Sequence, residues 1–156
     1  MTNDEFSERI LAMTQTLYRV SYAHLSQSCD RNDAVQECLC RAWQKRHQLK
    51  DACYMQTWVI RILINACHDI QRKRGREVPG PGDAWATLPA APPDADVELH
   101  DALLRLEPAL RVPIVLHYME GYAIREIAQI LRLPEGTIKT RMASGRRALK
   151  HMLSEV

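Results

Sequence analysis

The chain has 156 residues, of which 46% are hydrophobic and 26% charged, a composition that is typical of a globular protein and excludes a disordered or fibrous one. Its net charge is only +2, and its apolar stretch at 59–67 is interrupted by Arg61 and Asn65, which excludes a membrane span there. The first residues are acidic where a signal peptide is basic, so we expect a cytoplasmic protein.

Charge is distributed unevenly along the sequence. Residues 1–76 carry a net charge of +4, residues 77–123 carry −6, and residues 124–156 carry +4. Two basic ends around an acidic middle favour a protein that grips a polyanion at two places. Chance clustering of solvated charge explains the pattern equally well, so charge alone does not decide the function.

Residues 3–73 show the three- and four-residue apolar spacing of amphipathic helices, and no strand-like alternation competes with it. A helix near 54–72 turns an apolar stripe to one side and Arg61 and Asn65 to the other. This helix leads into the basic run QRKRGR at 71–76. The helix dipole favours such a run by itself, so the run is weak evidence for a binding site.

Three aromatic residues, Trp43, Tyr54 and Trp58, are expected near this basic face. Each one taken singly is more typical of a core position. Aromatic rings beside cations are, however, the platforms on which unpaired bases stack. Their clustering beside Arg61 and Asn65 therefore favours contact with single-stranded nucleic acid.

The segment VPGPGDAWATLPAAPPDAD holds five of the eight prolines and no lysine or arginine. Proline blocks helix formation and the segment lacks apolar periodicity, so we predict a linker at 77–96 between domains at 1–76 and 97–156. In the second domain, Pro108 is suited to the first turn of a helix, whereas Pro113 indicates a kink or a later start.

Residues 121–149 have the spacing of a helix-turn-helix. A short amphipathic helix with Ile124 and Ile127 on its inner side is followed by a break at 132–134 and a longer helix from about Glu135. The outer side of the longer helix carries short polar and basic groups that can reach base edges and phosphates. Any amphipathic helix exposes such groups, so it is the spacing that favours DNA binding.

The sequence contains no motif for catalysis or metal binding. It lacks H-E-x-x-H, a P-loop and a nucleophile elbow, and its six histidines are scattered. The five cysteines form no C-x-x-C pair, so we expect reduced, mostly buried thiols and no zinc. A redox sensor built on Cys29, Cys38 and Cys40 is a weaker alternative. We predict no enzyme, no cofactor and no metal site.

Three segments together resemble the extracytoplasmic function (group four) sigma factors of the sigma-70 family. DAVQECLCRAW at 33–43 looks like the core-binding segment of region 2. TWVIRILINACHDIQRKRGR at 57–76 resembles the tryptophan-containing helix that ends in a basic run, with Asn65 and Asp69 at characteristic positions. Residues 104–142 are similar to region 4. The occurrence of all three in this order is highly specific, whereas the last one alone is not.

The resemblance implies an all-α protein with two small helical domains, sigma region 2 and sigma region 4, joined by the proline-rich flexible linker. It implies a sigma factor that binds the largest subunits of core RNA polymerase, directs promoter-specific transcription initiation and is regulated by an anti-sigma factor. No small-molecule substrate and no membrane insertion are implied. The alternative is a helix-turn-helix regulator that works without polymerase and binds duplex DNA alone, usually as a dimer.

The resemblance also implies roles for individual residues. Those expected at the polymerase are Asp33, Gln36, Glu37 and Arg41. Those expected at the minus-ten element, besides a base-capturing loop from about Arg46 to Tyr54, are Trp58, Arg61, Asn65, Arg72, Lys73, Arg74 and Arg76. Those expected at the minus-thirty-five element are Thr137, Lys139, Thr140, Arg141, Ala143, Ser144 and Arg147.

One departure from the family pattern falls in the second helix of the helix-turn-helix. Ser144 and Gly145 stand where family members often have arginine and alanine. Serine cannot make the bidentate contact to guanine that arginine makes, so the promoter sequence cannot be carried over from relatives. Glycine costs about 1 kcal/mol of helix stability against alanine, and Gly145 either permits a close approach or is a tolerated loss.

Overall fold

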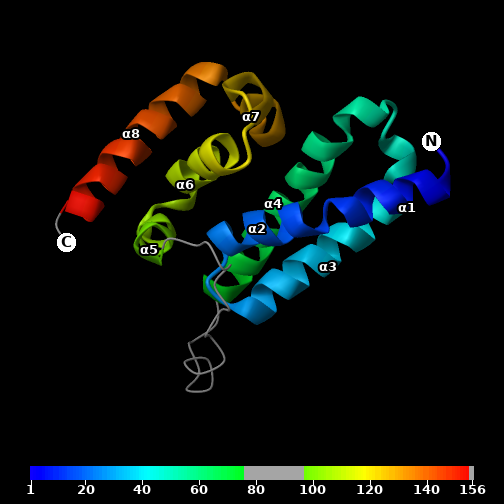
Figure 1. The fold of residues 1–156 in the computed structure, drawn as a ribbon, viewed down its shortest axis with the longest axis horizontal. Helices are drawn as coiled ribbons and strands as arrows, with labels where there is room; N and C mark the ends of the chain where they lie inside the picture. The colour runs from blue at the N-terminus through cyan, green and yellow to red at the C-terminus, as the bar shows by residue number, and fades with distance from the viewer. Residues whose placement is uncertain (76–96, 155–156) are drawn as a thin grey trace. The chain divides into compact units, whose positions relative to one another are not determined.

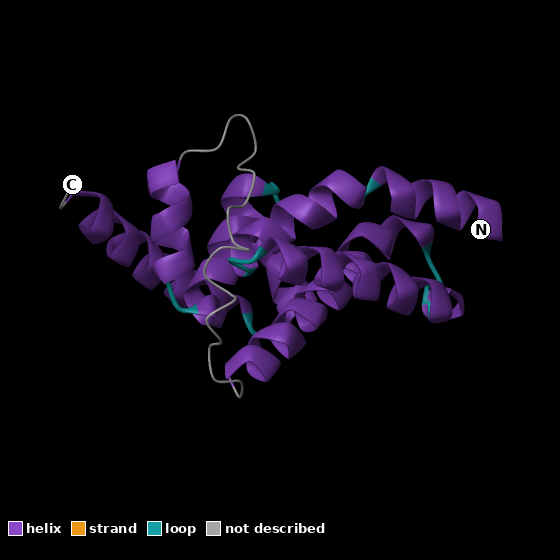
Figure 2. Cartoon of the chain, turned by 90° about the horizontal axis from the view of Figure 1, so that it is seen from below, coloured by secondary structure: helices purple, strands orange, loops and turns teal. Residues whose placement is uncertain are grey.

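The structure, a computed structural model, describes residues 1–75 and 97–154, and within them it contains helices and no strand (Figures 1 and 2). The chain divides into two compact units, Met1–Leu88 and Pro89–Val156. The predicted all-α fold is confirmed. The predicted linker and Arg76 lie outside the described residues.

Within residues 1–75, the N-terminal unit contains four α-helices and two short 3-10 turns. The helices are α1 (Asn3–Ala12), α2 (Thr14–His24), α3 (Ser28–Gln44) and α4 (Met55–Gly75). The turns η1 (Arg46–Gln48) and η2 (Ala52–Tyr54) connect α3 to α4. Figure 1 shows α1 and α2 following one another along the α3–α4 pair. The core lies where α2, α3 and α4 meet, and its fully buried members include Leu17, Val20, Val35, Ile60 and Leu63.

The N-terminal end of α1 is fixed by a reciprocal cap. The Thr2 hydroxyl accepts a hydrogen bond from the Glu5 backbone N–H at 3.1 Å, and the Glu5 carboxylate accepts one from the Thr2 backbone N–H at 3.0 Å. Two backbone donors that a helix start leaves without partners are thereby satisfied. The cap gives α1 a defined start and directs Phe6, one residue further on, into the core.

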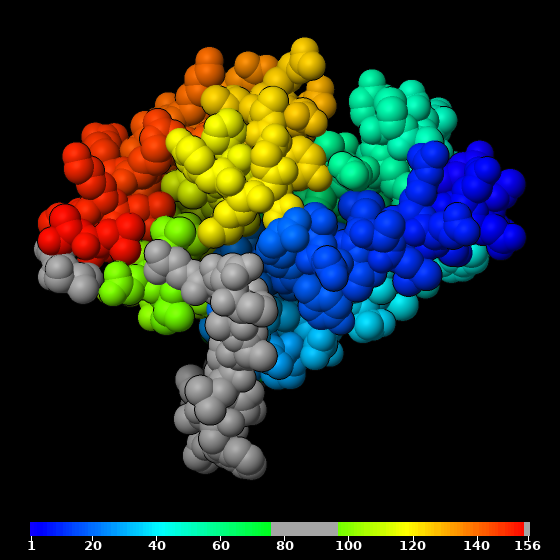
Figure 3. Space-filling model, in the orientation of Figure 1, coloured from blue at the N-terminus to red at the C-terminus, as the bar shows by residue number. Residues whose placement is uncertain are grey.

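The described part of the C-terminal unit, residues 97–154, contains five helical segments. These are α5 (Val97–Arg105), α6 (Pro108–Ile114), the π-helical turn η3 (Val115–Met119), α7 (Ile124–Leu131) and α8 (Glu135–Ser154). In the space-filling view, side chains fill the spaces between the ribbons of each unit (Figure 3).

Two prolines shape α6 in different ways. Pro108 is its first residue, as predicted, because a first turn needs no N–H donor from that position. Pro113 lies inside α6, so the predicted alternative of a later helix start at this proline is wrong. Proline removes one hydrogen bond from the α-helical ladder, and the helix continues as a π-turn from Val115.

The end of α5 is held by a buried arginine that the sequence analysis did not single out. Arg111 of α6 is only 3% exposed. Its Nη1 donates to the backbone oxygens of Leu103 at 3.4 Å, Leu104 at 3.2 Å and Leu106 at 3.4 Å. The last carbonyls of a helix lack intrahelical partners, so one guanidinium here caps α5 and joins it to α6.

Gly145 lets α8 pack closely on α6. A Cβ at this position would lie 2.3 Å from Ile114 Cδ1 and 3.4 Å from the Leu110 backbone oxygen. Both Gly145 and Ile114 are buried. Of the two explanations for this glycine, the close approach is therefore the one that the structure supports.

Replacing Gly145 with valine is expected to lower the free energy of unfolding of the C-terminal unit by about 1–3 kcal/mol, because the added carbons overpack a buried contact. Gly136→Val is the matched control, since a Cβ there meets nothing within 4 Å. Urea denaturation followed by circular dichroism measures both. Equal unfolding midpoints for the two variants would show that α6 and α8 do not need the glycine.

Candidate nucleic-acid interface

A tight turn joins α7 to α8. Arg132 ends α7 in the left-handed region, with φ 57° and ψ 46°, and the backbone N–H of Leu133 donates to the Ala128 oxygen at 3.0 Å. The chain leaves α7 sharply and begins α8 at Glu135. The predicted short helix, break at 132–134 and longer helix are confirmed.

One side of α8 is buried against the rest of the unit. The buried residues follow the three- and four-residue spacing of a helix face and are Ile138, Met142, Gly145 and Leu149. The predicted minus-thirty-five residues lie off this face, with Lys139, Thr140 and Arg147 exposed and with Thr137, Arg141, Ala143 and Ser144 partly buried. The structure thus brings all seven to one helix, outside its packed stripe.

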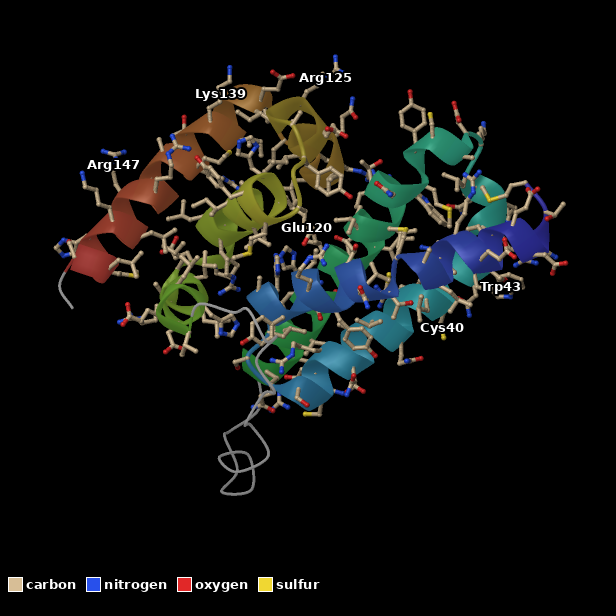
Figure 4. The ribbon with its side chains drawn as sticks, in the orientation of Figure 1. Cys40, Trp43, Glu120, Arg125, Lys139 and Arg147 are labelled. Carbon is tan, nitrogen blue, oxygen red and sulfur yellow. The ribbon has the colours of Figure 1, made fainter. Side chains whose placement is uncertain are left out.

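Several cations lie on the outer side of the helix-turn-helix. Figure 4 shows Arg125 of α7 and Lys139 and Arg147 of α8 pointing away from α6. Arg125 and Arg132 are also exposed. The sequence analysis missed them, although they are basic residues at the two ends of the first helix of the predicted helix-turn-helix. Arg146, also exposed, donates to the Tyr118 hydroxyl at 3.2 Å. This surface combines short side chains with flanking positive charge, which suits duplex DNA.

In the N-terminal unit, the basic end of α4 is partly neutralised by the unit's own acids. Arg74 donates from Nη2 to Asp30 Oδ1 at 3.0 Å, and the Asp30 side chain is only 11% exposed. This ion pair ties the end of α4 to the start of α3. Arg72 pairs with Asp69 one turn earlier, while Lys73 is exposed.

The predicted polymerase-binding residues lie along α3. Asp33, Gln36 and Glu37 are exposed, and Arg41 is partly buried. Arg41 Nε donates to Glu37 Oε1 at 2.9 Å, and Arg41 Nη2 donates to Asp69 Oδ2 on α4 at 3.2 Å. Asp69 therefore contacts one arginine predicted to bind polymerase and one predicted to bind DNA.

The ion pair between Arg41 and Asp69 shifts the pKa values of both its members. Burial works to raise the pKa of Asp69, but hydrogen bonds from Arg72 and Arg41 outweigh it and lower that pKa below its ordinary value. Burial likewise works to lower the pKa of Arg41, and its hydrogen bonds to Glu37 and Asp69 raise it instead. Both shifts favour the charged forms of Asp69 and Arg41.

Trp58, Arg61 and Asn65 lie on successive turns of α4. Asn65 is exposed, while Trp58 and Arg61 are partly buried. Trp58 and Trp43 both pack on Phe6 of α1, with ring centroids 6.3 and 6.0 Å away. The expected aromatic cluster is therefore centred on Phe6, and the structure places two of its three members there.

The loop between α3 and α4 is anchored at its start by Arg46. The Arg46 guanidinium lies 4.0 Å from the centre of the Trp43 ring and donates to the Trp43 backbone oxygen at 2.7 Å and to Asn3 Oδ1 at 3.0 Å. A hollow of about 360 Å³ lies beside it. Its lining comes from both the start of α1 and the loop: Met1, Thr2, Asn3, Phe6, Arg46, His47 and Leu49. Tyr54, at the other end of the loop, is 59% exposed.

Two sequence families match the two halves of the chain. The family described as Sigma-70 region 2 matches residues 10–77, and the family described as Sigma-70, region 4 matches residues 96–149. The chain is 30% identical to the ECF RNA polymerase sigma factor SigM of Mycobacterium tuberculosis, over 88% of this chain and 71% of that protein. It is 29% identical to SigW of Bacillus subtilis, over 98% and 91%.

The chain belongs to the extracytoplasmic function sigma factors of the sigma-70 family. Its fold resembles that of the sigma factor RpoE in a co-crystal structure with the anti-sigma factor NepR from Bartonella quintana, with a TM-score of 0.83, 27% identity and coverage of 96% and 97% of the two chains. CnrH, solved with the cytosolic domain of CnrY, has the same fold at 18% identity and a TM-score of 0.74, over 99% and 90%. The predicted function as a sigma factor, which directs RNA polymerase to promoters, is confirmed.

The cysteines of this sigma factor differ from the prediction. Cys38 and Cys67 are buried, but Cys29, Cys40 and Cys53 are exposed, so the expectation of mostly buried thiols is wrong. Cys40 lies two positions after Cys38 on α3. Side chains two positions apart on a helix point in different directions, so these two thiols do not face each other. Burial raises the pKa of Cys38 to about 12, which leaves a poor site for oxidation and weakens the redox alternative.

The described residues hold no cluster of three or more histidine, cysteine or acidic side chains that suits a metal ion. Within residues 1–75 and 97–154, no helix is both long enough and apolar enough to cross a membrane.

A thiol reagent such as Ellman's reagent is expected to label the exposed Cys29, Cys40 and Cys53 of the native sigma factor at pH 8 and the other two cysteines only after unfolding. The thiolate is the reactive form, and a pKa of about 12 leaves roughly one Cys38 thiol in ten thousand ionised at this pH. Labelling in guanidinium should give all five. Rapid labelling of Cys38 in the native protein, identified by peptide mass, would contradict the structure.

Proposed function

We propose that this sigma factor divides promoter recognition between its two units. Residues 97–156 act as region 4 and read the minus-thirty-five element as duplex, while residues 1–76 act as region 2, bind core polymerase and engage the minus-ten element. The observation that supports this division best is the outer side of α8, which follows a tight turn and exposes short and basic side chains opposite a packed stripe. We propose no catalytic role, and we place the protein in the cytoplasm with its polymerase.

The chemistry of α8 suits entry into the major groove. Thr140, Ala143 and Ser144 are short, so the helix backbone can approach base edges closely. Thr140 donates its hydroxyl proton to the Gly136 backbone oxygen at 3.0 Å, which leaves the hydroxyl oxygen able to accept from a base. The longer cations beside them, such as Lys139, Arg141 and Arg147, reach the phosphates that fix the register.

The N-terminal unit offers a different surface, suited to unpaired bases. Asn65 is exposed on α4, two turns from Trp58, and the loop between α3 and α4 borders a polar hollow. Extruding a base costs a few kcal/mol of stacking, so cations for the backbone and polar groups for the base must offset it. Arg61 and Lys73 on the same helix supply positive charge for that purpose.

The acidic outer side of α3 is the proposed contact with polymerase. Asp33 and Glu37 are exposed one turn apart and suit a basic partner surface.

RpoE and CnrH, whose folds this chain shares, were each solved with a second protein, NepR and CnrY. We propose that this sigma factor, too, has an anti-sigma partner that covers its polymerase-binding or DNA-binding surfaces.

Run-off transcription from a genomic promoter library, with core polymerase alone and with this protein added, tests the proposal. Defined start sites are expected only when the sigma factor is present. Lys139→Ala combined with Thr140→Ala is expected to reduce initiation about tenfold or more, because a base contact and a phosphate contact are lost together. Binding of this double variant to core polymerase should not change.

Arg105→Ala is the matched control, since Arg105 is an exposed cation of the same unit on α5. It should leave start sites and yields unchanged. The proposal fails if no new start sites arise and the protein instead binds duplex DNA tightly without polymerase. That result would favour the polymerase-independent regulator.

A further inference from the structure

Three cations follow one edge of α8, beside its outer side. Lys139, Arg146 and Lys150 are exposed and lie about two turns and then about one turn apart, so they share one strip along the helix. At the rise of an α-helix this strip is about 17 Å long. We call these three residues the α8 basic edge. Of the three, the proposed function gives a role to Lys139 alone.

The cations of the α8 basic edge are not neutralised by acids of the protein. Among the residues that the structure describes, no acidic side chain pairs with Lys139, Arg146 or Lys150. The basic end of α4 differs, because Arg72 and Arg74 are both paired with acids of their own unit. The positive charge of the α8 basic edge is therefore available to an external anion.

Arg146 is held in place by a residue of another element. Its Nη1 donates to the Tyr118 hydroxyl of η3 at 3.2 Å. The Tyr118 ring meets the His117 ring edge-on, with centroids 4.9 Å apart and planes at 83°. His117 Nδ1 lies 2.8 Å from the Tyr122 backbone oxygen, which can only accept, so Nδ1 is the donor. These contacts link the Arg146 guanidinium to the turn that leads into α7.

The position of the α8 basic edge suits a strand of DNA phosphates. A helix in the major groove has a phosphate strand on either side. Side chains at the centre of its outer side, such as Thr140 and Ser144, meet base edges, whereas long cations at its edges reach phosphates. The bond to Tyr118 uses one N–H of Arg146 and leaves the others for an anion. It also removes part of the side chain's rotamer freedom before DNA binds.

We propose that Arg146 and Lys150 form, together with Lys139, a phosphate-binding edge that holds duplex DNA independently of its sequence, and that Tyr118 is a positioning residue for Arg146. The inference rests on the proposed function, because it takes the outer side of α8 as the side that enters the major groove. Its consequence is that α8 reads bases and holds the DNA backbone with different residues.

The test measures binding of the full chain, without polymerase, to two fluorescein-labelled duplexes over a range of salt concentrations. One duplex carries a minus-thirty-five element found by run-off transcription, and the other has the same base pairs in shuffled order. Arg146→Gln and Lys150→Gln are each expected to weaken binding to both duplexes about two- to fivefold at low ionic strength. Each should also lower the slope of log Kd against log salt by about one, because one phosphate contact is lost.

Tyr118→Phe separates the positioning of Arg146 from the phosphate contact itself. It keeps the aromatic ring and the charge of Arg146, so the salt slope should not change. Affinity for both duplexes should fall, but by less than with Arg146→Gln, and this loss should disappear when Arg146→Gln is already present. A loss that persists beside Arg146→Gln overturns the positioning role of Tyr118.

Two further variants serve as controls. Arg105→Gln removes an exposed cation of α5 in the same unit and should have little effect on either duplex. Thr140→Ala should weaken binding to the promoter duplex alone, because a base contact carries sequence information and a phosphate contact does not. The phosphate-binding edge is overturned if Arg105→Gln weakens binding as much as Arg146→Gln, or if Arg146→Gln affects the promoter duplex alone.

Thr140→Ala also separates this inference from the proposed function. If it leaves the preference for the promoter duplex unchanged, the reading role of α8 fails, and the inference that rests on it fails too. If Thr140→Ala removes that preference but Arg146→Gln behaves like Arg105→Gln, the inference alone is overturned.

Discussion

The close packing of α8 on α6 determines which side of α8 is turned to solvent. At Gly145 the backbone of α8 comes close to α6, and an added Cβ would lie 2.3 Å from Ile114 Cδ1. Ile138 and Met142 are then fixed inward, and Thr140 and Lys139 are fixed outward. The candidate DNA surface of the C-terminal unit is thus a consequence of a core contact.

The same unit depends on one further interaction for its shape. Arg111 binds three carbonyls at the end of α5, so α5 and α6 meet at a defined place. A buried arginine without such acceptors would be costly, and the three carbonyls would otherwise lack donors. Through α6, this interaction supports the surface on which α8 rests.

Ion pairs join the helices of the N-terminal unit at the edge of its apolar core. Arg74 joins the end of α4 to the start of α3 through Asp30, and Asp69 joins the two helices again through Arg41. Two cations of the basic run at the end of α4, Arg72 and Arg74, are therefore paired with acids of the same unit.

Local sequence patterns predicted much of this arrangement. The break at 132–134, the helix start at Pro108 and the polar outer side of α8 follow from periodicity and from the missing N–H of proline, which can be read from neighbouring residues alone. These local patterns did not predict the pairing of Arg74 with Asp30, which lies 44 residues away in the sequence. Periodicity tells which side of a helix is buried, but not which residue of another helix lies opposite.

The same limit explains what was missed at the candidate sites. The capping role of Arg111 and the position of Phe6 between two tryptophans depend on contacts between separate helices. The exposure of three cysteines was misjudged for another reason. Cysteine is usually buried, and this general preference outweighed the helix positions of Cys29 and Cys40, which turn them outward.

Site-specific photo-cross-linking from α8 tests the central claim most directly. A photoreactive residue at position 140 is placed in the sigma factor, which is assembled with core polymerase on a promoter, and a residue at the exposed position 109 of α6 serves as the control. The account predicts cross-links from position 140 to duplex DNA upstream of the start site and none from position 109. Cross-links from position 140 to polymerase alone, or equal DNA cross-links from both positions, would contradict it.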